Sequence, residues 1–108
     1  MHKIRRVDLE NSDQIYEQLS EFARKLKGSH RVSKVYLYGS FAKGRFNEGS
    51  DIDLIIVGDF QGKMPQRIEK IFDLTSLPVE PLVYTEAEFA QMKDRPFLQD
   101  VLATAKEL

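Results

Sequence analysis

Residues 39–57 read GSFAKGRFNEGSDIDLIIV, and the order of features in this stretch decides the fold: a glycine–serine turn, an intervening polar segment, then two aspartates opening an apolar run. The run from Asp51 to Val57 predicts a buried strand. Alternate side chains of a strand share a face, so Asp51 and Asp53 should project together, with Cα atoms about 6.6 Å apart. Such carboxylates can share one divalent cation or hold a pair, and hard oxygen ligands suit magnesium. Solvated acids at a strand start are the alternative interpretation.

The residues before the aspartates predict a turn that could hold phosphate. Val32–Tyr38 is rich in β-branched and aromatic residues, which indicates a strand running directly into Gly39 and Ser40. Glycine allows a sharp bend or close approach to a ligand. Ser40 could cap a short following helix, or it could offer its hydroxyl to a phosphate beside the free amides of that helix start.

Two basic residues follow the turn, and their role is open at this point. Lys43 and Arg45 could contact a triphosphate or could lie on a solvated surface loop. A P-loop is disfavoured, because Gly39 and Gly44 have the required spacing but Arg45-Phe46 stands where that motif needs lysine and a hydroxyl residue.

Composition predicts one soluble domain over residues 1–108. The formal net charge is −1, which argues against broad nucleic-acid binding, since such binding draws on clustered lysine and arginine. Cysteine is absent, which excludes disulfides and thiolate metal sites and favours a cytoplasmic protein. No apolar run approaches the ~20 residues of a membrane span. A chain of 108 residues is small for an enzyme that must also enclose its substrate, so we expect a partner to complete the site.

Helical spacing and capping signals predict the rest of the scaffold. Residues 12–27 have an amphipathic pattern, with Gly28 placed to end the helix. Pro65 suits the first turn of a helix that continues through Leu74. Thr85-Glu86-Ala87-Glu88 fits a capping box, which gives Glu86 and Glu88 structural roles. Residues 97–108 carry a last apolar stripe, which belongs either to the core or to a partner surface, and the tyrosines and phenylalanines are assigned to the core.

These elements predict an α+β domain with a small mixed β-sheet packed against helices. The first two strands are joined by a short connection and should be antiparallel neighbours, which brings Gly39 beside the start of the Asp51 strand. The helix between the second and third strands permits a parallel crossover. Pro81 lies within the third strand, Pro78–Thr85, and proline cannot donate to a sheet ladder, so this strand should lie at an edge or be bulged.

The pattern Gly39-Ser40, ten residues, Asp51-x-Asp53 closely resembles the signature of minimal nucleotidyltransferases of the DNA polymerase beta-like superfamily, the family of the MntA-type antitoxins. The resemblance covers roughly residues 30–108 and implies a polymerase beta palm-like fold. It places a third carboxylate at Glu80, where aspartate is commoner in the family. Residues 88–102 are similar to the family's closing helices.

The resemblance implies a magnesium-dependent transferase that moves AMP from ATP to a hydroxyl acceptor. It assigns catalysis and the binding of two Mg²⁺ ions to Asp51, Asp53 and Glu80. Nucleotide binding is assigned to Gly39, Ser40, Lys43 and Arg45. The acceptor implied by the family is a tyrosine on a small helical HEPN-type toxin, with this chain as antitoxin.

Two alternatives stay open beside that hypothesis. A catalytically weak or inactive antitoxin would act by steric binding of its partner. Transfer to a small molecule such as an aminoglycoside would need an acceptor domain that the sequence does not show. Homo-oligomerisation is left open.

Overall fold

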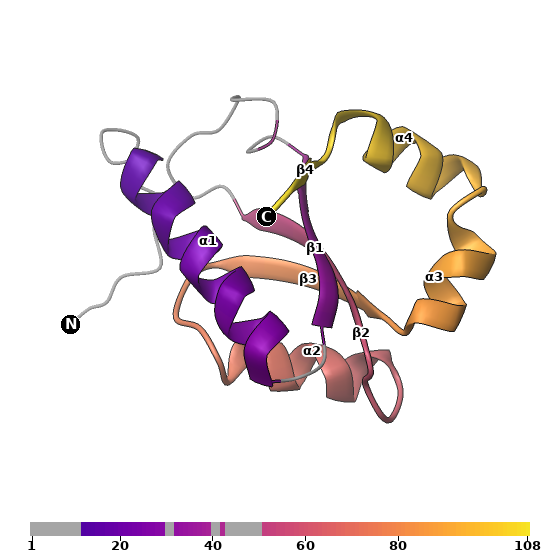
Figure 1. The fold of residues 1–108 in the computed structure, drawn as a ribbon, viewed down its shortest axis with the longest axis horizontal. Helices are drawn as coiled ribbons and strands as arrows, with labels where there is room; N and C mark the ends of the chain where they lie inside the picture. Colours follow the sequence, from indigo (N-terminus) through magenta and orange to yellow (C-terminus); the bar gives the residue numbers. More distant parts are fainter. Residues whose placement is uncertain (1–11, 30–31, 40–41, 43–50) are drawn as a thin grey trace.

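The computed structural model describes residues 12–29, 32–39, 42 and 51–108. Ser40, Lys43, Arg45 and the short helix expected after Ser40 lie outside these residues. The elements run in the order α1 (Ser12–Ser29), β1 (Val32–Tyr38), β2 (Ile52–Gly58), α2 (Met64–Phe72), β3 (Val79–Tyr84), α3 (Glu86–Met92), α4 (Pro96–Thr104) and β4 (Lys106–Glu107). Figure 1 shows the sheet at the centre, with α1 to its left and α3 and α4 to its right.

The sheet is mixed and has the strand order β3-β2-β1-β4. β1 and β2 are antiparallel, and β2 and β3 are parallel, as the connection lengths predict. β3 lies at an edge, which confirms the position inferred from Pro81. The register is continuous from Ile52↔Val79 to Val57↔Tyr84 and includes Leu54↔Pro81, so the strand accommodates proline without a bulge.

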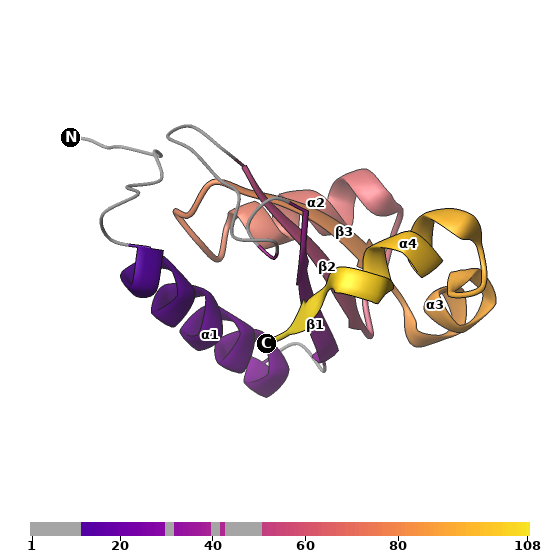
Figure 2. The same ribbon diagram turned by 90° about the horizontal axis from the view of Figure 1, so that it is seen from above.

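The sheet is covered on both faces, because successive side chains of its strands point to opposite sides. One face packs against α1 and α2 through a cluster that includes Leu19, Leu26, Leu54, Ile56 and Ile71. The other face carries a second cluster with α3 and α4: Ile55, Val57, Tyr84, Phe89, Leu98 and Val101. Figure 2 shows α1 and α4 on opposite sides of β1. Burial on both sides explains why β2 reads as a continuous apolar run.

Most helix signals in the sequence are confirmed, with two boundary corrections. Pro65 lies in the first turn of α2, and Thr85 caps α3 by accepting a hydrogen bond from the Glu88 amide at 3.1 Å. The prediction that Gly28 ends α1 is wrong, because Gly28 stays in the helix, which ends at Ser29. α2 ends at Phe72, so Leu74 lies beyond it and not within it.

The C-terminal residues form a strand that the sequence pattern does not predict. β4 pairs with β1 through Tyr36↔Glu107 and Leu37↔Lys106, and the Leu108 amide donates to the Val35 carbonyl at 2.8 Å. The apolar stripe of residues 97–108 is therefore helical only as far as Thr104. Its core assignment holds for the buried Leu98 and Val101, whereas Phe97 is 51% exposed.

Within the described ranges, none of the helices is both long and apolar enough to cross a membrane.

Candidate active site

Asp53 lies in the middle of a row of polar side chains that crosses three strands. It is the register partner of Tyr38 on β1 and of Glu80 on β3. Directly paired residues of neighbouring strands project to the same face. The central position of β2 therefore brings Tyr38, Asp53 and Glu80 together at one end of the face that α3 and α4 cover.

The carboxyl groups of Asp53 and Glu80 lie close enough for a protonated Asp53 to donate a hydrogen bond to Glu80. The pKa of Asp53 is raised from 3.8 to about 6, first by burial, then by the charge of Glu80, by the hydrogen bond to Glu80 and by the charge of Asp51. Asp53 is partly buried, whereas Asp51 and Glu80 are exposed. Like charges held this close disfavour full ionisation unless a cation offsets them.

Gly39 packs its backbone directly against the Asp53 carboxyl group. Its φ is +75°, a left-handed conformation that side-chain-bearing residues rarely adopt. A Cβ added at this position would collide with Oδ2 of Asp53. The site therefore needs glycine both for the turn, which the sequence predicted, and for the approach of β1 to Asp53, which only the structure shows.

The donor set fits a hard divalent cation, although the carboxylates do not form a complete cage. Within residues 12–29, 32–39, 42 and 51–108, no group of three or more His, Cys, Asp or Glu side chains is arranged to hold a metal. In the same ranges no lysine or arginine forms an ion pair with Asp53 or Glu80. Two adjacent carboxyl groups that have no basic partner among the described residues and supply oxygen ligands suit Mg²⁺ with further ligands from water or phosphate.

The structure brings Asp53, Glu80 and Gly39 together, and Asp51 lies just before β2, close enough for its charge to raise the pKa of Asp53. Ser40, Lys43 and Arg45 lie outside the described residues, and their roles stay predictions.

Tyr38 is a member of this site that the sequence assigned only to the core. The pKa of its phenol is raised to about 12, first by burial and then by the charges of Asp53, Tyr84 and Glu80. The phenol therefore stays protonated at neutral pH. The signal that could have found it is positional: Tyr38 immediately precedes Gly39 in the strand that pairs with Asp53.

Glu88 has a structural role, as predicted. Its carboxylate accepts a hydrogen bond from the Thr85 amide at 2.9 Å and from Nη1 of the buried Arg67 at 2.7 Å. Hydrogen bonding to Arg67 is the main reason that the pKa of Glu88 is lowered. This ion pair ties α2 to the start of α3 on the side of β3.

The chain belongs to the nucleotidyltransferase domain family, whose model matches residues 16–103. A curated relative named "Putative protein adenylyltransferase", from Methanocaldococcus jannaschii, is 46% identical over 43 residues. That match covers 38% of this chain and 43% of the relative, so it spans less than half of the relative's length.

Solved structures share the fold. A "putative nucleotidyltransferase" from Sulfolobus solfataricus superimposes with a TM-score of 0.62 at 24% identity, covering 80% of each chain. A toxin–antitoxin structure with AMP-PNP superimposes with a TM-score of 0.51 at 17% identity, covering 90% of this chain and 71% of that chain. These likenesses confirm the predicted α+β nucleotidyltransferase fold.

Proposed function

We propose that this protein is a magnesium-dependent nucleotidyltransferase that moves AMP from ATP to a hydroxyl group and releases pyrophosphate. The observation that carries the proposal is the Asp53–Glu80 carboxyl pair packed against the Gly39 turn in a domain of the nucleotidyltransferase family. An adenylyltransferase name for the curated relative and AMP-PNP in the toxin–antitoxin structure support ATP as the nucleotide.

Asp51, Asp53 and Glu80 would hold the metal. Two bound Mg²⁺ ions would supply charge stabilisation for the attacking and leaving oxygens. Without a cation, Asp53 and Glu80 repel the triphosphate as well as each other, so nucleotide and metal should bind together. Ser40, the amides after Gly39, Lys43 and Arg45 are proposed to bind the phosphates that leave as pyrophosphate.

A residue of this chain is also proposed to accept the proton of the acceptor hydroxyl. The acceptor oxygen forms a bond to the α-phosphorus while the bond from that phosphorus to the bridging oxygen breaks, and the acceptor proton must move to a base. Glu80 is the better base, because it is exposed on the edge strand and can meet an incoming acceptor, whereas Asp53 is partly buried on the central strand.

The acceptor is proposed to be a tyrosine hydroxyl on a partner protein, a HEPN-type toxin, which makes this chain an antitoxin. The protein-adenylyltransferase name of the curated relative and the toxin–antitoxin setting of the structural neighbour support a protein acceptor. An ATP substrate and the absence of cysteine are consistent with a cytoplasmic location. We also propose that residues 1–108 form one minimal nucleotidyltransferase domain.

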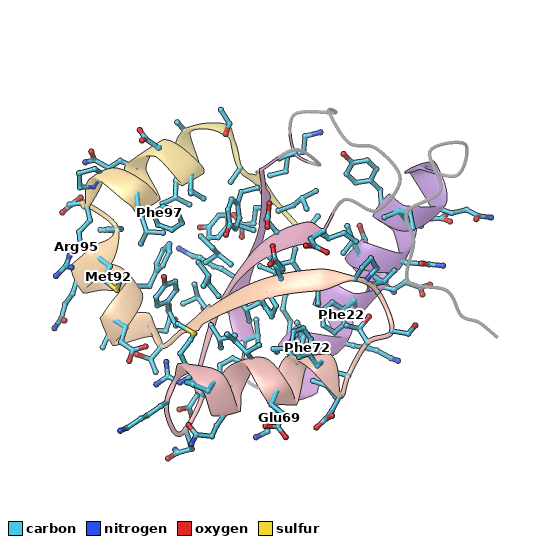
Figure 3. The ribbon with its side chains drawn as sticks, turned by 180° about the vertical axis from the view of Figure 1, so that it is seen from behind. Phe22, Glu69, Phe72, Met92, Arg95 and Phe97 are labelled. Atoms are coloured by element: carbon cyan, nitrogen blue, oxygen red, sulfur yellow. The ribbon has the colours of Figure 1, made fainter. Side chains whose placement is uncertain are left out.

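Intact-mass measurement tests the proposal. The purified protein, ATP, Mg²⁺ and the candidate toxin are incubated together, and the toxin should gain the mass of one or more AMP groups. Glu80→Gln should slow this gain by about 10²-fold, while Glu69→Gln, which changes a matched exposed acid on α2, should not slow it (Figure 3). An unmodified toxin that is fully neutralised without ATP would instead establish steric binding.

A further inference from the structure

We propose that Phe97, oriented by Tyr38, is a stacking platform for the nucleobase of the nucleotide substrate. This inference rests on the proposed function and adds a residue that recognises the nucleotide. It changes the core assignment that the sequence suggested for the phenylalanines.

The first observation is an aromatic row on the α3/α4 face that ends in an exposed ring. Phe89 packs between Tyr84, at 6.5 Å between ring centroids, and Tyr36, at 6.0 Å, and it is only 7% exposed. Tyr38 and Phe97 continue the row as an edge-to-face pair, with centroids 6.4 Å apart and planes at 89°. Phe97 is 51% exposed, so about half of its surface is open to a ligand.

The second observation is that α4 does not need Phe97 for its core. Leu98 and Val101 of the same helix are 1% and 8% exposed and anchor it to the sheet. Figure 3 shows Phe97 on the side of α4 that faces the sheet. The Phe97 ring is thus held in place by an anchored helix and by Tyr38, yet about half of the residue remains exposed to solvent.

The third observation is distance from the carboxyl pair. Tyr38 is the register partner of Asp53 and immediately precedes Gly39, so Phe97 lies one aromatic ring beyond the carboxylates. A nucleobase is joined to its α-phosphate through a single ribose, so a base stacked on Phe97 would leave the α-phosphate on the Tyr38 side of the ring, toward the carboxyl pair. An uncharged planar base also avoids the repulsion that the acids exert on phosphate.

Stacking predicts a particular pattern of nucleotide recognition. Every nucleobase has a π-face, so stacking on an aromatic side chain strengthens binding with little discrimination between bases. The platform should therefore favour any nucleoside triphosphate over inorganic tripolyphosphate. It should not by itself distinguish ATP from GTP.

Calorimetric binding with Mg²⁺ tests this pattern in the full chain. Phe97→Ala should weaken ATP and GTP binding by about tenfold or more, since a base–aromatic stack is worth roughly 1–3 kcal/mol. Tripolyphosphate binding should change less than about twofold, because tripolyphosphate has no ring to stack. Phe97→Tyr should restore nucleotide affinity. Phe72→Ala, which removes a 47% exposed phenylalanine from α2, should bind like the wild type.

The outcomes separate this inference from the proposed function. Equal ATP affinity in wild type and Phe97→Ala would overturn the platform and leave the transferase proposal standing. Unchanged ATP affinity with a selective loss of transfer to the protein acceptor would mean that Phe97 contacts the acceptor, which also overturns the nucleobase assignment. A wild-type protein that binds no nucleotide with Mg²⁺ would refute both proposals. Melting temperatures without ligand confirm that each variant is folded.

Discussion

Asp53→Asn should stabilise the metal-free protein while removing its response to Mg²⁺ and ATP. The pKa of Asp53 is raised in the folded state, so its folded form binds a proton more tightly than its unfolded form. The stability that this proton provides is fully present below pH 3.8 and is lost as the pH rises to about 6. At pH 7.5 the ionised Asp53 therefore costs stability, and an uncharged amide removes that cost.

The expected gain in stability of Asp53→Asn follows from the pKa shift of Asp53. The pKa of Asp53 rises from 3.8 to about 6 on folding. At ~1.36 kcal/mol per pKa unit, this rise sets an upper limit of about 3 kcal/mol on the stability that Asp53→Asn can add. Asp53 is only partly buried, and solvent screening reduces this to about 1 kcal/mol. For a domain of this size about 1 kcal/mol corresponds to roughly 4–8 °C in melting temperature.

Thermal melts followed by circular dichroism at pH 4 and pH 7.5 measure the difference in melting temperature between Asp53→Asn and the wild type. Asp53→Asn should have a higher melting temperature than the wild type at pH 7.5, and the difference in melting temperature should be smaller at pH 4. Asp100→Asn, which changes an exposed acid on α4, serves as the control and should show no such pattern. Addition of Mg²⁺ and ATP should raise the melting temperature of the wild type only. A variant less stable than the wild type at pH 7.5, or one that still responds to Mg²⁺ and ATP, would refute the reasoning.

Three further perturbations test neighbouring parts of the molecule. Glu80→Gln should leave the urea unfolding curve nearly unchanged and lower AMP transfer by about 10²-fold; full turnover would remove Glu80 from the site. Gly39→Ala should cost at least about 1–2 kcal/mol through its left-handed φ, and the collision with Asp53 should also lower metal-dependent nucleotide binding, measured by calorimetry. Arg67→Met should destabilise the fold by at least about 2 kcal/mol in urea unfolding, because the Val83 carbonyl, 3.1 Å from Nη1, loses its Arg67 donor and Glu88 loses its charged partner while still accepting from the Thr85 amide; wild-type stability would show that this partly buried ion pair is dispensable.

Local sequence patterns predicted much of the fold. The apolar run after Asp53 identified β2, since only a strand buried on both faces tolerates such continuity. Thr85 and Glu88 identified the start of α3, because a capping box is formed within four residues. Pro81 limited β3 to an edge position or a bulge, since proline lacks the amide that a central strand would use, and the structure shows the edge position. For the site, the sequence named Gly39, Asp53 and Glu80, which the structure brings together, while the roles of Asp51, Ser40, Lys43 and Arg45 stay predictions.

Tertiary structure alone decided the features that depend on contacts between distant residues. Residues 106–107 contain no strand signal, and their pairing with β1 arises because the preceding helix delivers them to its free edge. The close approach of the Asp53 and Glu80 carboxyl groups arises because a parallel crossover sets those two residues in register. Phe97 and Leu98 are adjacent apolar residues in the sequence, yet one is half exposed and the other buried. Their difference is set by how α4 rotates against the sheet, and that rotation depends on packing partners that no local pattern specifies.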